Sequence, residues 1–169
     1  MIPIAAPDVG EVEMDAVRDV IESGQLADGP EVRRFEDAFA DICGTEYAVA
    51  TTNGTTALHA TFEALGVGEG DAVITTPFSF VASANAVRLA GAEPVFADVE
   101  PETLTIDPRS VAGILAERDD VVAVLPVHLY GMPAEMDRLQ ALADAHDVAL
   151  IEDAAQAHGA RYQGEVVGS

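Results

Sequence analysis

Short apolar segments alternate with helical patterns through most of the chain, and this alternation restricts the possible folds more than any other feature. The apolar segments span residues 47–50, 72–75, 94–97, 121–125 and 148–151. A segment that is apolar on nearly every residue fits a strand buried on both faces, as in parallel sheets. We therefore expect an α/β fold, with a three-layer, mainly parallel sheet covered by helices.

Helical spacing predicts helices before and between these strands. Apolar residues three or four positions apart give each helix one apolar face. Asp107 is the expected cap of one helix, with Pro108 as its first residue, and Gly44 ends another. The predicted faces comprise Met14, Val17 and Ile21; Val32, Phe35, Phe39 and Ile42; Leu58, Thr61, Phe62 and Leu65; Ala84 and Val87; Val111, Ile114 and Leu115; and Met136, Leu139 and Leu142.

Composition indicates a folded, acidic protein. The 169 residues carry 30 acidic and eight basic side chains, for a formal net charge of −22, yet 49% of residues are hydrophobic. That apolar content excludes disorder. All the basic residues are arginine, and lysine is absent. The acidic, lysine-free composition indicates a salt-adapted microbial source, and it excludes nucleic acid as a partner because the surface repels phosphates.

The sequence shows no pattern for secretion, for crossing a membrane or for pairing of its single cysteine. The N-terminus has no basic segment followed by a long apolar one, so we expect no signal peptide. No window is long enough without charges to span a membrane, and we expect a cytoplasmic protein. Cys43 has no cysteine partner for a disulfide or a zinc cluster, and we expect it buried at a helix end. Residues 160–162 and 165–167 predict a hairpin around Gln163-Gly164.

One candidate binding segment follows the first predicted strand. In open α/β sheets, ligands bind beyond the carboxyl ends of the strands. Asn53-Gly54-Thr55 lies directly after residues 47–50 and opens a helix. The free amides and the positive end of that helix suit a phosphate, and Gly54 lets the backbone approach closely. An ordinary strand-to-helix turn with a cap fits the same residues.

Two further strand ends carry an aromatic ring and a carboxylate. Phe80 follows the strand 72–75, where it is either a core residue or a ring that lies flat on a heteroaromatic ligand. Asp153 follows the strand 148–151 and is followed by alanines. There it is either a helix cap or the partner of a protonated pyridine nitrogen, which would make that ring an electron sink.

Other polar residues are weaker candidates. Glu152 and Asp153 are adjacent in a strand, so their side chains point to opposite faces and cannot act as a pair. The histidines lack metal-ligand spacing, and we expect no metal site. His128 follows the strand 121–125, where a structural role and a role in lining the site both remain open. Residues 66–71 contain several glycines but lead from a helix into a strand, so they form a turn and not a dinucleotide fingerprint.

Taken together, these segments resemble one known family over essentially the whole chain. They are similar to the N-terminal half of the DegT/StrS-type nucleotide-sugar aminotransferases, which are fold-type I enzymes dependent on pyridoxal 5′-phosphate (PLP). The motifs that carry the resemblance are, in order, Ile2-Pro3, Gly29-Pro30, Asn53-Gly54-Thr55, Ala57-Leu58-His59, Ala82-Ser83-Ala84-Asn85-Ala86-Val87, Pro94-Val95-Phe96-Ala97-Asp98-Val99, Pro126-Val127-His128-Leu129-Tyr130-Gly131 and Glu152-Asp153-Ala154-Ala155-Gln156-Ala157-His158-Gly159.

The resemblance implies that five residues bind PLP. The amides of Gly54 and Thr55 would hold the phosphate. Phe80 would stack on the pyridine ring, and Asp153 would bind the ring nitrogen. Gln156 would reach the ring hydroxyl oxygen.

The resemblance also implies that the sequence covers only part of such an enzyme. In the family, the residues matching Gly168-Ser169 lead to a serine and then to the lysine that holds PLP as a Schiff base. We therefore expect that lysine beyond Ser169 and no catalytic residue within residues 1–169. These residues would form the N-terminal part of an incomplete large domain, with residues 1–30 as an N-terminal helix and crossover segment and the C-terminal domain absent. Asn53 stands where the family usually has serine, and it can still donate to a phosphate.

The function implied is transfer of an amino group, from glutamate as the usual donor, to a nucleotide-linked keto-sugar. Such reactions belong to polysaccharide biosynthesis, and the complete protein would be a homodimer. One alternative is a PLP-dependent sugar dehydratase of the same family, in which histidine replaces the lysine. Another is a non-catalytic regulatory domain or remnant. A Rossmann-type nucleotide binder is disfavoured because the glycine fingerprint is missing.

Overall fold

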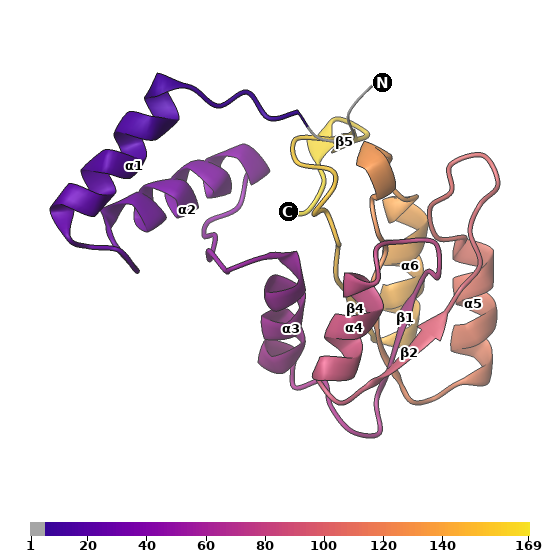
Figure 1. Ribbon diagram of the computed structural model, residues 1–169. Coiled ribbons are helices and arrows are strands. Elements are labelled where there is room, and N and C mark those ends of the chain that lie inside the picture. Colours follow the sequence, from indigo (N-terminus) through magenta and orange to yellow (C-terminus); the bar gives the residue numbers. More distant parts are fainter. Residues whose placement is uncertain (1–5) are drawn as a thin grey trace.

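The computed structural model describes residues 6–169 and contains a parallel sheet flanked by helices (Figure 1). Each neighbouring pair of strands in this sheet is parallel. The strands, in the spatial order β2-β1-β3-β4, are β1 (Ala72–Thr75), β2 (Glu93–Phe96), β3 (Val121–Val124) and β4 (Ala149–Leu150). The predicted α/β class and these strands are confirmed.

Helices cover both faces of the sheet. Two hydrophobic clusters hold the layers together: Ile74 of β1 packs in the cluster with α5 and α6, and the adjacent Val73 packs in the cluster with α3 and α4. Adjacent strand residues point to opposite faces, so an all-apolar strand needs a helix layer on each side. The helices are α1 (Glu11–Ser23), α2 (Pro30–Cys43), α3 (Gly54–Leu65), α4 (Ala82–Leu89), α5 (Pro108–Glu117) and α6 (Met136–His146).

The first two helices extend away from the sheet (Figure 1). The helix α2 ends before Gly44, as predicted, and α1 ends before Gly24. Their apolar faces remain largely uncovered, because α1 has no buried residue among those described and α2 buries only Ala40. Cys43 is the last residue of α2, as expected, but it is only half-buried, so the expectation of a buried cysteine was wrong.

The strand predicted at residues 47–50 was wrong. This segment belongs to no strand, and the side chains of Tyr47 and Val49 are 78% and 81% exposed. The backbone N–H of Ala50 donates to the Glu36 carboxylate of α2 at 2.8 Å. An apolar run favours extended backbone, but a strand also requires a neighbour to pair with. Within residues 6–169 the segment has no such neighbour.

The hairpin near the end of the sequence is confirmed. It comprises β5 (Arg161–Tyr162) and β6 (Glu165–Val166), which pair antiparallel. The turn residues Gln163 and Gly164 both have positive φ, 51° and 97°, as a type I′ turn requires. The Tyr162 hydroxyl donates to the Asp137 carboxylate of α6, which lowers the pKa of Asp137 and attaches the hairpin to the helix layer.

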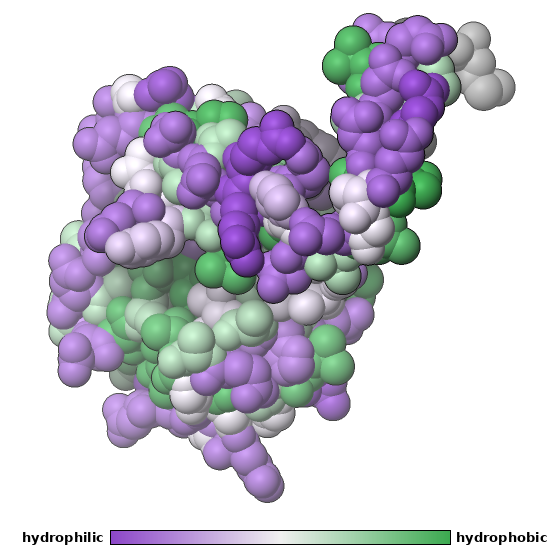
Figure 2. All heavy atoms as spheres, turned by 90° about the vertical axis from the view of Figure 1, so that its left-hand side faces the viewer, coloured by the Kyte–Doolittle hydropathy of each residue, from purple (hydrophilic) through white to green (hydrophobic). Residues whose placement is uncertain are grey.

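Hydrophilic residues cover much of the face shown in Figure 2, and hydrophobic residues gather there around a hollow. Within the described part of the chain, every helix is too short or too polar to cross a membrane.

Replacement of Phe62 tests the packing between α3 and the sheet. The side chain is fully buried, and Phe62→Ala should lower the free energy of unfolding by about 3–5 kcal/mol through lost burial and a residual cavity. Leu65→Ala on the same helix is the matched control, because Leu65 is 52% exposed and should change stability by less than about 1 kcal/mol. Urea unfolding measures both, and equal losses would contradict this packing.

Candidate functional site

The N-terminus of α3 has the form of an anion-binding turn. Asn53 caps the helix, its Oδ1 accepting from the backbone N–H of Thr56 at 2.9 Å. Among the described residues, no acceptor is found for the amides of Gly54 and Thr55, which the first turn of a helix leaves free. A Cβ added at Gly54 would lie 3.4 Å from the Cβ of Ala155. The loop after β4 therefore lies within van der Waals reach of this helix end.

Asp153 is held in place by its main chain and by its side chain. Beyond β4, its backbone N–H donates to Pro126 at 2.9 Å, and its carbonyl accepts from His128 at 3.0 Å. Its carboxylate is largely buried and accepts from the Ser83 hydroxyl at 2.7 Å and from the Ala155 N–H at 3.2 Å. The predicted ligand is thus a carboxylate with a fixed orientation.

Ser83 is the site residue that the sequence interpretation left without a role. It lies on α4 and is 1% exposed, beside the buried Ala86 and Val87 on the same helix. A polar residue three and four positions before buried apolar ones lies on the buried face of a helix, and buried polar groups have hydrogen-bond partners. That signal was present in the sequence, but it did not identify Asp153 as the partner.

Gln156 lies on the same loop after β4 as Asp153, whereas Phe80 lies on the loop after β1. The Gln156 Oε1 accepts from the backbone N–H of Tyr130 at 3.1 Å. An amide oxygen occupied in this way leaves the side-chain NH₂ as the donor for other partners. Phe80 precedes α4, and its side chain is 67% exposed. The exposed ring of Phe80 is thus accessible for stacking on a flat ligand.

One cavity brings together all five predicted cofactor residues. Its volume is about 240 Å³, slightly below the usual size range of pockets for small molecules. Its lining includes Gly54, Thr55, Phe80, Asp153 and Gln156. These residues come from the loops after β1 and β4 and from the N-terminus of α3, so separate parts of the chain build the cavity.

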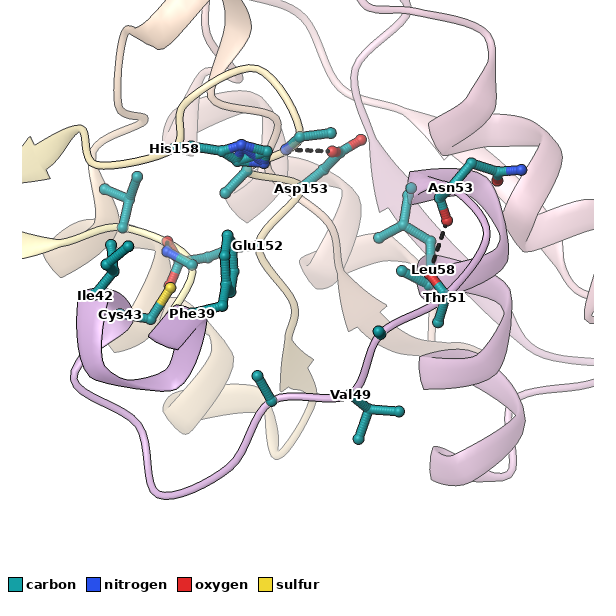
Figure 3. Close-up of a pocket in the computed structure, with 18 of the residues that line it drawn as sticks. Phe39, Ile42, Cys43, Val49, Thr51, Asn53, Leu58, Glu152, Asp153 and His158 are labelled. Carbon is teal, nitrogen blue, oxygen red and sulfur yellow. Dashed lines mark hydrogen bonds between the residues drawn. The ribbon is translucent and has the colours of Figure 1, made fainter. Parts of the chain in front are cut away.

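A second, larger cavity lies on the α2 side of Asp153 (Figure 3). Its volume is about 490 Å³, and its lining, which includes Phe39 and Val49, is mainly apolar. The rings of Phe39 and His158 meet edge to face, with centroids 5.6 Å apart. The two cavities share Asp153 in their linings, but the larger one lacks Thr55, Phe80 and Gln156. The smaller cavity is the candidate site, because all five predicted cofactor residues line it.

Glu152 and Asp153 have separate partners, as their positions in an extended segment predicted. The Glu152 Oε2 lies 2.7 Å from the Nε2 of His128 and accepts from the Gly168 N–H at 2.8 Å. The Nδ1 of His128 accepts from the Ala134 N–H at 3.0 Å, so the hydrogen bonds assign the ring proton to Nε2. His128 is fully buried, and its role is structural. In the described part of the chain, no group of three or more His, Cys, Asp or Glu side chains is placed to hold a metal ion.

The sequence and fold match one protein family and several solved structures. The family model described as the DegT/DnrJ/EryC1/StrS aminotransferase family matches residues 7–169. An aminotransferase from Psychrobacter cryohalolentis is 45% identical, with a TM-score of 0.92, over 98% of this chain and 42% of that one. DesV from S. venezuelae is 42% identical, with a TM-score of 0.83, over 94% of this chain and 43% of DesV.

A third structure aligns over the whole of this chain. The putative sugar aminotransferase Spr1654 from Streptococcus pneumoniae, solved in its PMP-form, is 28% identical with a TM-score of 0.93, and 46% of it is covered. The chain thus spans less than half the length of these three proteins. The resemblance predicted from the motifs is confirmed: the chain belongs to the DegT/DnrJ/EryC1/StrS aminotransferase family.

Proposed function

We propose that this chain forms the PLP-binding part of an aminotransferase. The observation that carries the proposal is the single cavity lined by all five residues that the family motif assigns to the cofactor. The donors and acceptors around it fit the group, with free amides at a helix N-terminus for the phosphate and a buried carboxylate for the ring nitrogen. Spr1654 has been solved in PMP- and PLP-forms, which supports the same cofactor here.

Each of the five cofactor residues has a defined task in this proposal. The amides of Gly54 and Thr55 bind the phosphate, and Phe80 covers one face of the ring. The Asp153 carboxylate accepts a hydrogen bond from the protonated ring nitrogen and so keeps that nitrogen protonated. Gln156 donates from its NH₂ group to the ring hydroxyl oxygen. When bound, PLP supplies an electron sink for the carbon from which a proton is removed.

The amine that would carry PLP covalently is not among residues 1–169, because they contain no lysine. We propose that these residues bind and orient the cofactor, while proton transfer at the amino-donor carbon requires a group from elsewhere. The substrate proposed for the whole protein is a nucleotide-linked keto-sugar, with glutamate as amino donor, in polysaccharide biosynthesis. The name of Spr1654, a putative sugar aminotransferase, supports this substrate class.

The setting proposed for the whole protein is a homodimer in a salt-rich cytoplasm. The formal net charge of −22 supports high salt, because counter-ions screen the self-repulsion of so acidic a surface. The apolar side chains of α1 are exposed, among them Val12 at 78% and Ile21 at 63%. Exposed apolar surface of this kind supports contact with a second copy of the protein.

Removal of the Asp153 carboxylate tests the proposed contact to the ring nitrogen. Asp153→Ala should weaken binding of pyridoxamine 5′-phosphate (PMP) by about 10- to 100-fold, the loss expected for a hydrogen bond to a charged group. Calorimetric titration of the whole chain with PMP measures this. Asp107→Asn is the control, because it alters a helix cap of α5 and Asn caps equally well. Equal PMP affinity of the wild type and Asp153→Ala would contradict the proposal.

Substitution of Asn53 separates phosphate binding from helix capping. Asp caps a helix as well as Asn does, so Asn53→Asp should leave the unfolding midpoint almost unchanged. The added negative charge beside the amides of Gly54 and Thr55 should weaken PMP binding by about tenfold or more. Pyridoxamine, which lacks the phosphate, should bind both proteins equally. A similar loss for both ligands would show that the phosphate does not lie at this helix end.

Reduction with borohydride tests the proposed division of tasks. Wild-type chain mixed with PLP and then reduced should carry no pyridoxyl group on any side chain, because lysine is absent. Peptide mass spectrometry after digestion measures this. A pyridoxyl group on a side chain would overturn the view that residues 1–169 hold the cofactor without a covalent bond.

A further inference from the structure

A hydroxyl group on α4 contacts the carboxylate that the proposed function assigns to the ring nitrogen. The Ser83 Oγ lies 2.7 Å from the Asp153 Oδ2, and both residues are buried. The two residues are 70 positions apart in the sequence. The contact therefore depends on the fold and joins the helix after β1 to the segment after β4.

The direction of the hydrogen bonds around Ser83 follows from its single proton. The Ser83 Oγ has three neighbours: the Asp153 Oδ2 at 2.7 Å, the Ser79 Oγ at 3.2 Å and the Phe80 carbonyl at 3.4 Å. Because an ionised carboxylate only accepts and forms the shortest contact, Ser83 donates to Asp153. Ser83 then accepts from the Ser79 hydroxyl. The result is a chain of donors from Ser79 through Ser83 to Asp153.

This chain of donors also reaches the loop that carries the aromatic ring of the site. Phe80 lies between Ser79 and Ser83, and the backbone N–H of Ser83 donates to the Phe80 carbonyl at 3.3 Å. Ser83 thus contacts both the residue proposed to cover the ring and the residue proposed to bind its nitrogen. The Ala155 N–H restrains the other oxygen of Asp153, at 3.2 Å. Together the two donors fix the rotation of the carboxylate.

We propose that Ser83 is a positioning residue, whose hydroxyl holds the Asp153 carboxylate in the orientation that accepts the protonated ring nitrogen of the cofactor. The inference rests on the proposed function. Ser83 touches no reacting atom in this account, and it acts only through Asp153. Loss of the hydroxyl leaves a carboxylate that only the Ala155 N–H restrains, so it can rotate away from the ring.

The test uses PMP labelled with ¹⁵N in its ring, bound to the whole chain. The ¹⁵N chemical shift reports whether the ring nitrogen is protonated, and a merely structural residue would not change it at saturating PMP. Wild-type protein should move the signal to the protonated position at a pH where free PMP is unprotonated. Ser83→Ala should move it back toward the free position and weaken PMP binding by about tenfold.

Two further variants of Ser83 separate the hydroxyl from its packing. Ser83→Thr keeps the hydroxyl and should restore the protonated signal. Ser83→Cys is nearly isosteric but only a weak donor, so it should behave like Ser83→Ala even if the alanine variant folds poorly. Thr105→Val is the control, because Thr105 is also 1% exposed and its hydroxyl bonds only Thr103 among the described residues. It should leave the ¹⁵N signal unchanged.

The outcomes distinguish this inference from the function on which it rests. If wild-type protein leaves the ¹⁵N signal of PMP at the free position, the proposed function fails and this inference fails with it. If wild type gives the protonated signal, Asp153→Ala loses it and Ser83→Ala and Ser83→Cys retain it, the proposed function stands and only the role of Ser83 is overturned.

Discussion

The parallel hydrogen-bond ladder of the sheet is the constraint on which the site depends. Backbone bonds continue past the ends of the strands: the N–H of Leu125 donates to Ile74, and that of Asp153 donates to Pro126. The Thr75 hydroxyl adds a bond to the Leu125 carbonyl at 2.9 Å inside the core. Because parallel strands end at one edge, the loops that follow them meet there. The position of Asp153 is thus fixed by the sheet, and its orientation by Ser83 and Ala155.

A protein with a formal net charge of −22 repels anions at long range, so a phosphate site in it requires a local source of positive charge. The proposed site resolves this locally, because backbone amides at the N-terminus of α3 supply partial positive charge at short range. Salt screens the acidic surface over distances beyond about 10 Å at 0.1 M. In the proposed site the first turn of α3 therefore carries the phosphate contact, and Asn53 caps that turn without adding a negative charge.

Periodicity was sufficient to predict most of the fold. The helices and β1 to β4 follow from apolar spacing, and the hairpin turn follows from Gln163-Gly164. The segment 47–50 was assigned wrongly for a physical reason: an apolar pattern describes one strand, whereas pairing depends on a second one. The half-buried Cys43 has a similar cause, since burial depends on what packs against a helix and α2 extends away from the sheet (Figure 1).

The residues expected to bind the cofactor could be named from the sequence, but the hydrogen bonds that orient their side chains could not. The family resemblance assigned Gly54, Thr55, Phe80, Asp153 and Gln156 to one cofactor, and the structure places all of them around one cavity. The partners that orient them were not predictable, because they depend on tertiary distances. The backbone of Tyr130 orients Gln156, and Ser83 orients Asp153. Neither contact has a signal in local spacing.

In the proposed function, one small cavity at the carboxyl edge of the sheet binds the cofactor. A crystal structure of the protein soaked with PMP tests it most directly. The account predicts electron density in the cavity, with the phosphate at the amides of Gly54 and Thr55, the ring against Phe80 and its nitrogen within hydrogen-bond distance of the Asp153 carboxylate. PMP bound elsewhere, or bound in the cavity with its ring nitrogen turned away from Asp153, would contradict it.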